Sequence, residues 1–579
     1  MYHRLKIKSV KDFKLQIQNL TLIILLFCIP IIMEGQNYQW AKSFKGTGDD
    51  YNGDIAVDDN GNIYCIGNLK GTCDFDPGFD SFNLTSAGDF DIYISKLDVN
   101  GNFVWAKKIG SNREDVGFAI TLDNSGNIYA TGWFTGTVDF DPGIATYNLT
   151  CYEDNCFILK LDPGGNFIWA KKFENSNYYY GFSIATDANG NVYTTGYFQN
   201  TVDFDPSTAI YYLTSAGGPD IFISKLDAKG NFVWAKKLGG RADDFGTSIK
   251  VDLSENVYVT GTFQETADFD PSSKTFELIS VGGTDLFISK LDANGNFVWA
   301  KNFGGSTRNF STHSDLDPNI ELGKNATIYI IGSFLSTVDF DPGVESKYLT
   351  SNGGFDIFIL KLETNGNFVW AKNFGGIKDE AGDLAIDTLG NIYLTGYFQG
   401  TVDFDPGVGN YSLTPKGISD IFISQLDTNG NFKWAKSIGG TGNDSGAWIS
   451  VSSGNIFITG YFEGTVDFNP PLSSNLKAIG TYDIFIAKYT SNLTGTIENN
   501  YKPDFCIYPN PTKCNVDIDL REQTNFTKVI VTNFSGQEII NKNYFNESAI
   551  HLQIEGESGI YFITVKTQNK LVNKKILKI

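Results

Sequence analysis

A tripeptide that recurs at nearly constant spacing constrains this chain more than any other feature. Trp-Ala-Lys occurs seven times in 579 residues, at intervals of 64 to 71 residues. The copies begin at Trp40, Trp105, Trp169, Trp234, Trp299, Trp370 and Trp434. Asp-Phe-Asp-Pro recurs in step from Asp74 onward, and a seventh copy from Asp467 reads Asp-Phe-Asn-Pro. A repeat of this length indicates similar structural units that pack against one another.

Each repeat reads as four short strands. In the sixth copy we expect strands at 383–387, 392–398, 420–427 and 432–437, with Gly-Asn or Asn-Gly turns after the first and the third. Asn-Gly between apolar stretches is a strong hairpin signal. Runs such as Ile421-Phe422-Ile423 are apolar on both faces, so each sheet should be covered on both sides. Sheets arranged around an axis, as in a β-propeller, meet this requirement.

The order of the strands predicts how the ring closes. The first Trp-Ala-Lys precedes any other strand, and none follows the last third strand, which begins at Asp483. We therefore expect residues 38–44 to supply the fourth strand of the last sheet. The prediction is an all-β chain with a seven-bladed β-propeller closed by its N-terminal strand. A linear solenoid would leave two sheet edges that need caps, and none is visible.

The repeated motifs resemble a known family. GNIYxTGxF and DIFISKLDxNGNFxWAK, followed by Gly-Gly, are similar to the bacterial SBBP-type β-propeller repeats over about residues 37–491. The resemblance implies the propeller fold. It says little about chemistry, because one fold serves many functions.

The C-terminal residues follow a different pattern. After a Thr- and Asn-rich stretch come YPNP, VIVTNFSGQEI, SGIYFITV and a basic, apolar ending, and their alternation predicts a small β-sandwich. In this order they resemble the type A sorting domain of the type IX secretion system of Bacteroidetes. The motif residues are Tyr508, Pro509, Asn510, Pro511, Gly536, Gly559, Tyr561, Lys574 and Lys575. The resemblance implies export through the type IX secretion machinery, removal of this domain, and a secreted or cell-surface product.

A leader precedes the repeats. Five basic residues lie before an apolar run from Leu20 to Met33, which is short for a membrane span and typical of a signal peptide. We place cleavage near Gly35/Gln36, so no stable membrane span is expected after processing. The expected organisation is a signal peptide at 1–35, the propeller at 36–491, a linker at 492–503 and the sorting domain at 504–579.

The charge distribution limits the partners. The whole-chain charge of −21 includes +3 in residues 1–35 and +2 in residues 501–579, so residues 36–500 carry −26. Such a surface repels phosphate backbones and anionic lipid, which argues against nucleic acid as a partner. Cationic partners, metal ions and neutral glycans remain, and solubility outside the cell is the simplest explanation of the charge.

The cysteines suggest disulfides. An even number of cysteines in an exported chain favours disulfide bonds over metal or redox chemistry. Removal of the leader leaves three close couples, Cys65/Cys73, Cys151/Cys156 and Cys506/Cys514. The first couple replaces other residues in one repeat only, at both positions, as bonded partners would. Closing this loop would stabilise the fold by roughly 2.5 kcal/mol on the chain-entropy model.

Strand direction predicts a variable face. The turns between first and second and between third and fourth strands share one end of the sheets, and the longer, variable connections share the other, where we expect ligands to bind. Two sets of carboxylates fall there: Asp50, Asp115, Asp244, Glu380 and Asp444 before the first strands, and pairs such as Asp74/Asp76 in the Asp-Phe-Asp-Pro segments. Oxygen ligands of this kind suit Ca²⁺. The alternative is that these residues form turns by bonding their own backbone.

Residues that break the repeat are the better candidates for ligand contacts. They are Tyr178, Tyr179, Tyr180, Arg241, Arg308, His313, Trp133 and Trp448. Aromatic rings beside acids and amides suit the stacking of sugars, and the alternative is that they pack between sheets.

Catalysis has little support in the sequence. His313 is the one histidine of the repeats, which argues against a Ser-His-Asp system or a multi-histidine zinc site. A pair of carboxylates would suffice for a glycosidase, but none stands out. We expect a recognition or scaffold protein without a cofactor, binding a glycan or protein, and not an enzyme. The alternatives are a carboxylate-based carbohydrate-active enzyme, with two carboxylates in a deep central pocket, and a purely structural surface protein.

Overall fold

The computed structural model describes residues 37–490 except 175–178, 308, 311–317, 377 and 471–473, and residues 506–578 except 509–511, 514, 525, 534–536 and 568–570. The expected signal peptide, its cleavage site and the linker lie outside the described residues. The chain divides into two compact units, Met1–Asn492 and Leu493–Ile579.

The first unit is all-β, as predicted from the repeats. Its described residues hold one helical turn, the 3-10 helix η1 (Lys324–Ala326). The strands that open each repeat are β2 (Tyr51–Val57), β8 (Val116–Leu122), β14 (Tyr179–Thr186), β20 (Phe245–Val251), β24 (Asn319–Leu322), β30 (Lys378–Ile386) and β36 (Ser445–Ser452). The second strands are β3 (Ile63–Leu69), β9 (Ile128–Phe134), β15 (Val192–Phe198), β21 (Val257–Asp268), β25 (Ile328–Phe334), β31 (Ile392–Gln399) and β37 (Asn455–Phe462).

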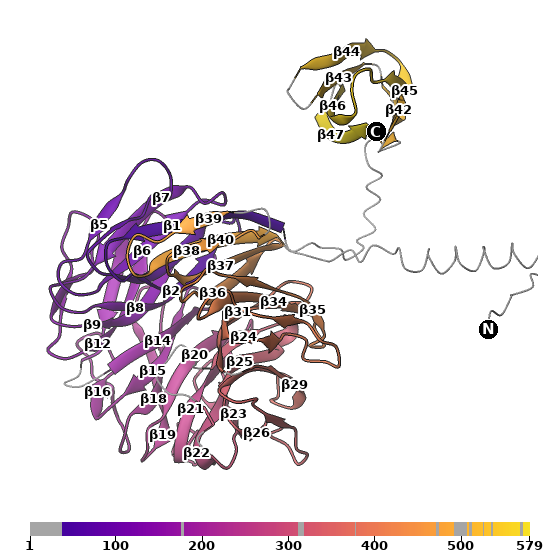
Figure 1. Ribbon diagram of the computed structural model, residues 1–579. Helices are drawn as coiled ribbons and strands as arrows, with labels where there is room; N and C mark the ends of the chain where they lie inside the picture. Colours follow the sequence, from indigo (N-terminus) through magenta and orange to yellow (C-terminus); the bar gives the residue numbers. More distant parts are fainter. Residues whose placement is uncertain are drawn as a thin grey trace, which may run out of the picture. The chain divides into compact units, whose positions relative to one another are not determined.

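The remaining strands complete antiparallel sheets in the predicted order. The third strands are β6 (Asp91–Leu97), β12 (Asn155–Leu161), β18 (Asp220–Leu226), β22 (Glu277–Leu291), β28 (Asp356–Leu362), β34 (Asp420–Leu426) and β40 (Asp483–Thr490). The fourth strands are β7 (Phe103–Ile109), β13 (Phe167–Lys172), β19 (Phe232–Gly240), β23 (Phe297–Phe303), β29 (Phe368–Phe374), β35 (Phe432–Ile438) and, for the last sheet, β1 (Asn37–Gly46). The N-terminal strand therefore pairs as expected: Ala41 lies opposite Ala487 and Phe44 opposite Ile484 of β40 (Figure 1).

The first strands pack side by side. Each contacts the first strand of the next repeat, and β36 also contacts β2. Apolar clusters fill the spaces between sheets; one of them joins Ile66 and Ile94 of one sheet to Ile120 and Phe157 of the next. Burial of both sheet faces explains the continuous apolar runs in the sequence.

A repeated polar motif fixes the turns between first and second strands. The Asp58 carboxylate accepts main-chain N–H groups from Asn60 and Asn62 and the side-chain amide of Asn62, while Gly61 has φ +79°. The left-handed conformation favours glycine at this position. The Gly-Asn signature of the repeat is thus a turn signature.

The Asp-Phe-Asp-Pro segments form small hairpins that join neighbouring sheets. They are β4 (Thr72–Asp74) with β5 (Asn83–Thr85), β10 (Thr137–Asp139) with β11 (Asn148–Thr150), β16 (Thr201–Asp203) with β17 (Tyr212–Thr214), β26 (Thr337–Asp339) with β27 (Tyr348–Thr350), β32 (Val402–Asp403) with β33 (Ser412–Leu413), and β38 (Thr465–Asp467) with β39 (Asn475–Lys477). β4 also pairs with β1 and β21 with β19, and isolated bridges join Glu174 to Asp203, Gly304 to Asp339 and Gly439 to Asp467. Most of these segments therefore contact the end of the fourth strand of the preceding sheet.

The second unit is a pair of sheets around one core. One sheet contains β41 (Cys506–Tyr508), β42 (Asn515–Thr524) and β45 (Glu547–Gln553). The other contains β44 (Glu538–Tyr544), β43 (Thr527–Asn533), β46 (Gly559–Thr567) and β47 (Leu571–Lys578). Val516 and Ile550 from the first sheet and Val531 and Ile563 from the second share one apolar cluster. This arrangement is the β-sandwich that alternation in the sequence predicts.

Candidate ligand-binding site

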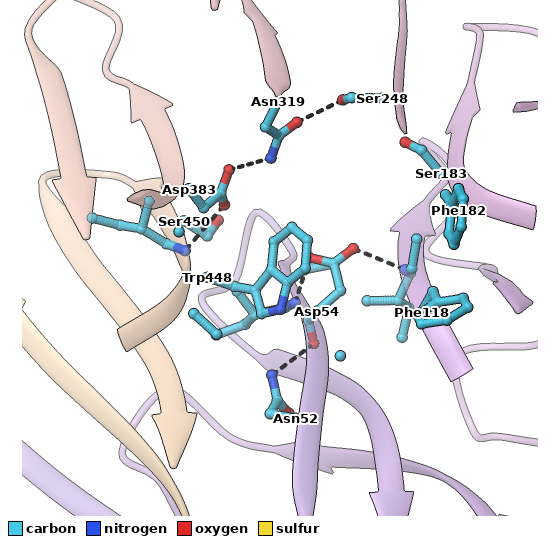
Figure 2. A pocket seen from close by; sticks show the side chains of 18 of the residues that line it. Asn52, Asp54, Phe118, Phe182, Ser183, Ser248, Asn319, Asp383, Trp448 and Ser450 are labelled. Atoms are coloured by element: carbon cyan, nitrogen blue, oxygen red, sulfur yellow. Dashed lines mark hydrogen bonds between the residues drawn. The ribbon is translucent and has the colours of Figure 1, made fainter. Parts of the chain in front are cut away.

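A cavity of about 890 Å³ lies among the first strands of the repeats. Side chains and backbone from β2, β8, β14, β20, β24, β30 and β36 line it, so every repeat contributes. Figure 2 shows labelled side chains that reach it from several of these strands. Most small-molecule sites are concave, largely apolar and carry a few placed polar groups. We therefore take this cavity as the candidate site.

Aromatic rings line the end of the cavity where the first strands begin. One aromatic group contains Phe118 of β8, Tyr180 and Phe182 of β14 and Tyr197 of β15. In this group the ring centroids of Phe118 and Phe182 are 5.3 Å apart, and those of Tyr180 and Tyr197 are 5.1 Å apart. These contacts hold the rings in fixed positions, which lowers the entropy lost when a ligand stacks on them.

The other aromatic group comes from repeats at the two ends of the propeller unit. Tyr51 of β2 packs against Tyr461 of β37, with ring centroids 5.8 Å apart, and Trp448 of β36 also lines the cavity. Because β2 and β36 contact each other, these residues meet although they are far apart in the sequence.

Polar side chains connect several pairs of neighbouring first strands inside the cavity. Asp54 accepts the main-chain N–H of Ile120 at 2.9 Å, and Asp383 accepts that of Ile449 at 3.1 Å. The side-chain amide of Asn319 donates to Asp383 at 2.6 Å, and Ser248 lies 2.5 Å from the Asn319 oxygen (Figure 2). Each bond spans two repeats. These bonds therefore stabilise the shape of the cavity on the sides where they occur.

Four charged side chains line the cavity. Lys250 pairs with Glu321 at 2.7 Å. Asp54 and Asp383 have no basic side chain within ion-pairing distance among the described residues. Burial raises the pKa of Asp54 to about 7 and that of Asp383 to about 8, and the neighbouring Asp54 charge adds to the second shift.

The structure gathers some of the predicted ligand residues and separates others. Tyr180 and Trp448 line the cavity, and Trp133 packs edge-on against Tyr180 with centroids 5.6 Å apart. Arg241 is exposed and lies outside the cavity lining. Tyr178, Arg308 and His313 fall outside the described residues.

One of these predictions is wrong. Tyr179 is fully buried in an apolar cluster with Cys156 and Phe222, so it cannot contact a ligand from solution. It occupies the position where other repeats carry a buried aspartate, and its large ring fills the space between sheets. The structure thus assigns Tyr179 to the core and its neighbour Tyr180 to the cavity.

The repeated carboxylates bind the chain's own amides. Asp115 accepts N–H groups from Ser111 and Thr135, and Asp244 and Asp444 make the equivalent bonds. Asp50 accepts the N–H of Lys70. Asp74 accepts N–H groups from Asp76 and Phe82, and Asp76 that of Gly78. These are the turn and loop bonds of the alternative prediction. The described residues contain no group of three metal-ligating side chains that would support the Ca²⁺ hypothesis.

Glu380 is misaligned by one residue in this carboxylate set. β30 pairs Glu380 with Tyr397, just as β36 pairs Ser445 with Tyr461. The residue equivalent to Asp444 is therefore Asp379. Counting ten residues from Trp370 fails because this repeat has one residue fewer between the tryptophan and the strand than the repeat of Trp434.

The disulfide predictions for the propeller unit are also wrong. Cys65, Cys73, Cys151 and Cys156 are free and buried. Cys151 and Cys156 belong to different apolar clusters, so they face different sides of their sheet. Cys65 and Cys73 share a cluster, where they act as small apolar side chains. Burial raises the pKa of Cys156 to about 12. Cys514 of the predicted Cys506/Cys514 couple lies outside the described residues.

Several cavity residues were missed from the sequence. Asp54, Asp383, Phe118 and Phe182 lie in the first strands, where the repeats differ most from one another. The position of these residues within a repeat places them in the first strands, which pack around the cavity. It does not show which side of each strand faces the cavity. A local bulge in most first strands shifts the alternation by one residue.

Comparison with known proteins identifies two parts of the chain. Residues 506–579 match the family model described as secretion system C-terminal sorting domain, and residues 168–197 and 233–262 match that of the β-propeller repeat named SBBP. The chain thus carries SBBP β-propeller repeats and a type IX secretion C-terminal sorting domain. The sorting domain directs the protein to the cell surface or the medium and implies contact with the secretion machinery.

The described residues include part of the sorting motif. Gly559 lies in β46, and Tyr561 is buried and donates its hydroxyl to the carbonyl of Glu557. Tyr508, Lys574 and Lys575 lie in strands β41 and β47, while Pro509, Asn510, Pro511 and Gly536 are outside the described residues. No helix among the described residues has the length and apolar character needed to cross a membrane.

Two curated proteins are similar to the chain. An uncharacterized WD repeat-containing protein of Acanthamoeba polyphaga mimivirus is 24% identical over 75% of this chain and 37% of its own length. Regulatory protein FlaEY of Caulobacter vibrioides is 24% identical over 60% of this chain and 36% of its own length. The chain spans little more than a third of either relative.

Solved structures show a weaker likeness. A structural genomics protein of unknown function from Bacteroides thetaiotaomicron has 11% identity and a TM-score of 0.26, covering 78% of this chain and 98% of its own. The extracellular region of plexin A4 has 8% identity and a TM-score of 0.36, covering 94% and 62%.

Proposed function

We propose that this chain is an exported, non-catalytic recognition protein that binds an extracellular ligand in the central cavity of a closed seven-bladed β-propeller. The contact between β2 and β36 and the pairing of β1 with β40 support the closed ring. The sorting domain directs this propeller to the cell surface or the medium. Glycan is the ligand class that the cavity favours, with a protein ligand as the other choice.

The aromatic lining carries the proposal. Two groups of rings, one with Phe118 and Phe182 and one with Tyr51 and Trp448, reach a single cavity from different repeats. Tyrosine and tryptophan offer a flat apolar surface and a polar edge, which suit a sugar ring and its hydroxyls. Amide and hydroxyl groups of Asn319, Ser248 and others supply hydrogen-bond partners beside them.

The carboxylates in the cavity favour an enzyme as a second candidate. Asp54 and Asp383 are two acids in a central pocket, the arrangement that a carboxylate-based glycosidase needs. However, both oxygens of Asp54 accept main-chain N–H groups, and those of Asp383 accept Asn319 and Ile449. Acids engaged in this way are poorly placed to transfer a proton or attack a sugar. Release of reducing ends from a bound oligosaccharide, abolished by Asp383→Asn, would favour the enzyme.

A glycan array with the full mature chain tests the proposal. We expect selective binding that Phe182→Ala weakens about ten-fold or more, because stacking of a flat ligand ring on an aromatic side chain contributes on the order of 1–3 kcal/mol. Tyr212→Ala is the matched control, since this tyrosine is 61% exposed on the outer hairpin strand β17. Absence of any glycan binding, or equal loss in both variants, would count against the proposal.

A further inference from the structure

The cavity has an unbalanced charge. Its lining holds three carboxyl groups, Asp54, Glu321 and Asp383, against one ammonium group, Lys250. Lys250 contacts Glu321 directly at 2.7 Å and acts on the other two carboxylates only at longer range. Two acids in the lining are therefore left without a paired cation among the described residues.

The hydrogen bonds of these two acids do not remove the imbalance. Asp54 accepts N–H groups of Ile55 at 2.7 Å and Ile120 at 2.9 Å, and Asp383 accepts from an amide side chain and a main-chain N–H. These donors are neutral. Buried charge is costly unless an opposite charge is close, and the raised pKa values of both groups reflect this cost. A cationic ligand would supply the positive charge that Asp54 and Asp383 lack nearby.

Aromatic faces beside the acids favour the same kind of ligand. A cation near the face of tryptophan, tyrosine or phenylalanine is attracted by the ring. Phe118, Phe182, Tyr51 and Trp448 line the cavity that contains Asp54 and Asp383. The charge of −26 on residues 36–500 would also concentrate cations around the molecule.

We propose that the cavity selects a glycan with free amino groups, a glucosamine-type oligosaccharide, whose ammonium group pairs with Asp54 and Asp383 while its rings stack on the aromatic lining. This inference rests on the proposed glycan-binding function. An amino sugar presents a ring face and an ammonium group on one rigid unit, which matches two features of one cavity. A lysine side chain carries the charge on a flexible stem and has no face to stack.

Isothermal titration calorimetry of the full mature chain tests the inference with two ligands of equal length. One is a glucosamine oligomer and the other its N-acetylated form, titrated at about pH 7, where an approaching ammonium group lowers the pKa of Asp54 and Asp383 and so favours their ionised form. We expect the free-amine oligomer to bind at least about ten-fold more tightly, because a hydrogen bond to a charged group is stronger than one to a neutral group.

Three variants locate the preference. Asp54→Asn and Asp383→Asn remove the charge and keep one acceptor oxygen for one of the two N–H donors that each carboxylate binds, so each should reduce the preference about ten-fold. Glu277→Gln is the control, because Glu277 is exposed on β22 outside the cavity lining. Melting temperatures of all variants identify any that fail to fold, and either aspartate variant alone suffices for the test.

The outcomes separate this inference from the proposed function. Equal affinity for both oligomers, lost in Phe182→Ala, would overturn the amino-sugar inference and leave glycan binding in place. If neither oligomer binds but other glycans do, the amino-sugar inference is likewise overturned and glycan binding stays in place. A preference that neither aspartate variant changes, or equally tight binding of a lysine oligomer, would show general attraction to the acidic surface and overturn the inference.

Discussion

Glycines in the second strands allow the backbones of the first and second strands to approach closely. Gly196 of β15 lies opposite the bulge in β14, and a Cβ atom there would lie 1.9 Å from the carbonyl oxygen of Tyr180. Gly132, Gly261 and Gly460 are in the same position of other repeats, each about as close to a carbonyl of its first strand. In these repeats, whose first strands carry a bulge, the Gly of the second strand is thus required by this close contact with the backbone of the first strand.

Gly196→Ala should destabilise the propeller unit by about 1–3 kcal/mol, the usual cost of overpacking. Urea unfolding followed by tryptophan fluorescence measures this loss. Gly464 is the control, because a Cβ atom there meets nothing within 4 Å and only its φ of +69° opposes alanine, at a cost of roughly 1 kcal/mol. Equal effects of both substitutions would contradict the argument from the carbonyl contact.

The buried cysteines give a second test at this scale. Cys65, Cys73, Cys151 and Cys156 should resist alkylation in the folded chain, because burial raises their pKa values and blocks access. Without reductant, peptide mapping should find all four labelled only after denaturation. A peptide that joins Cys65 to Cys73, or Cys151 to Cys156, would contradict the free thiols.

At the scale of elements, the single strand β1 joins the two ends of the propeller unit. It pairs with β40, a strand more than 400 positions later in the chain, and it also pairs with the hairpin strand β4. Phe44 of β1 is buried in a cluster with Cys65 and Ile484. One outer strand therefore holds the first and the last repeats together.

Phe44→Ala should lower the free energy of unfolding by about 3–5 kcal/mol, the usual cost of truncating a buried phenylalanine. Scanning calorimetry should also show a lower melting temperature of the propeller transition. Gln39→Ala, at an exposed position of the same strand, should change it little. Similar small shifts for both variants would mean that β1 does not hold the repeats together.

The strands were predictable because repetition reveals them. Seven copies average out local ambiguity, and the Gly-Asn turns mark each hairpin, so the expected range 392–398 agrees with β31 (Ile392–Gln399) within a residue. The cavity was predictable only in part. Tyr179 and Tyr180 look alike in the sequence, yet one is in the core and one in the cavity, because strand alternation and the bulge decide this. Residues at positions that vary between repeats, such as Asp54 and Phe182, could not be predicted to line the cavity from the sequence. Only the packing of the first strands against one another shows that they do.

At the scale of the whole molecule, the sorting domain should determine whether the protein crosses the outer membrane. A chain that lacks residues 504–579 should accumulate in the periplasm, since this domain is what the export machinery recognises. Cell fractionation with immunoblotting measures the distribution. The substitution Glu277→Gln in the propeller unit serves as an export control, since it should reach the surface or medium. Unchanged export of the truncated chain would contradict the role of the domain.

The pH dependence of stability follows from buried acids spread over the whole propeller unit. Burial raises the pKa of Asp50 and Asp54 to about 7 and of Asp244 and Asp383 to about 8, from an unfolded value of 3.8. Such groups hold a proton in the folded chain that the unfolded chain releases. Their contribution is therefore fully present below about pH 4 and is lost as pH rises through about 7 to 8. Acids of the turns, such as Asp98 and Asp123, have lowered pKa values, so their contribution is present at neutral pH and is lost as the solution becomes acidic enough to protonate them in the folded chain.

These opposite effects place maximum stability at mildly acidic pH. We expect the melting temperature of the propeller unit to fall as pH rises from about 5 to about 8, because the unfolded state binds fewer protons than the folded state in that range. Scanning calorimetry across this range measures it. Asp383→Asn should flatten the curve, because it removes one titrating group and keeps an acceptor for the N–H of Ile449. A melting temperature that rises steadily to pH 8, in the original chain and the variant alike, would show that the buried acids are ionised in the fold.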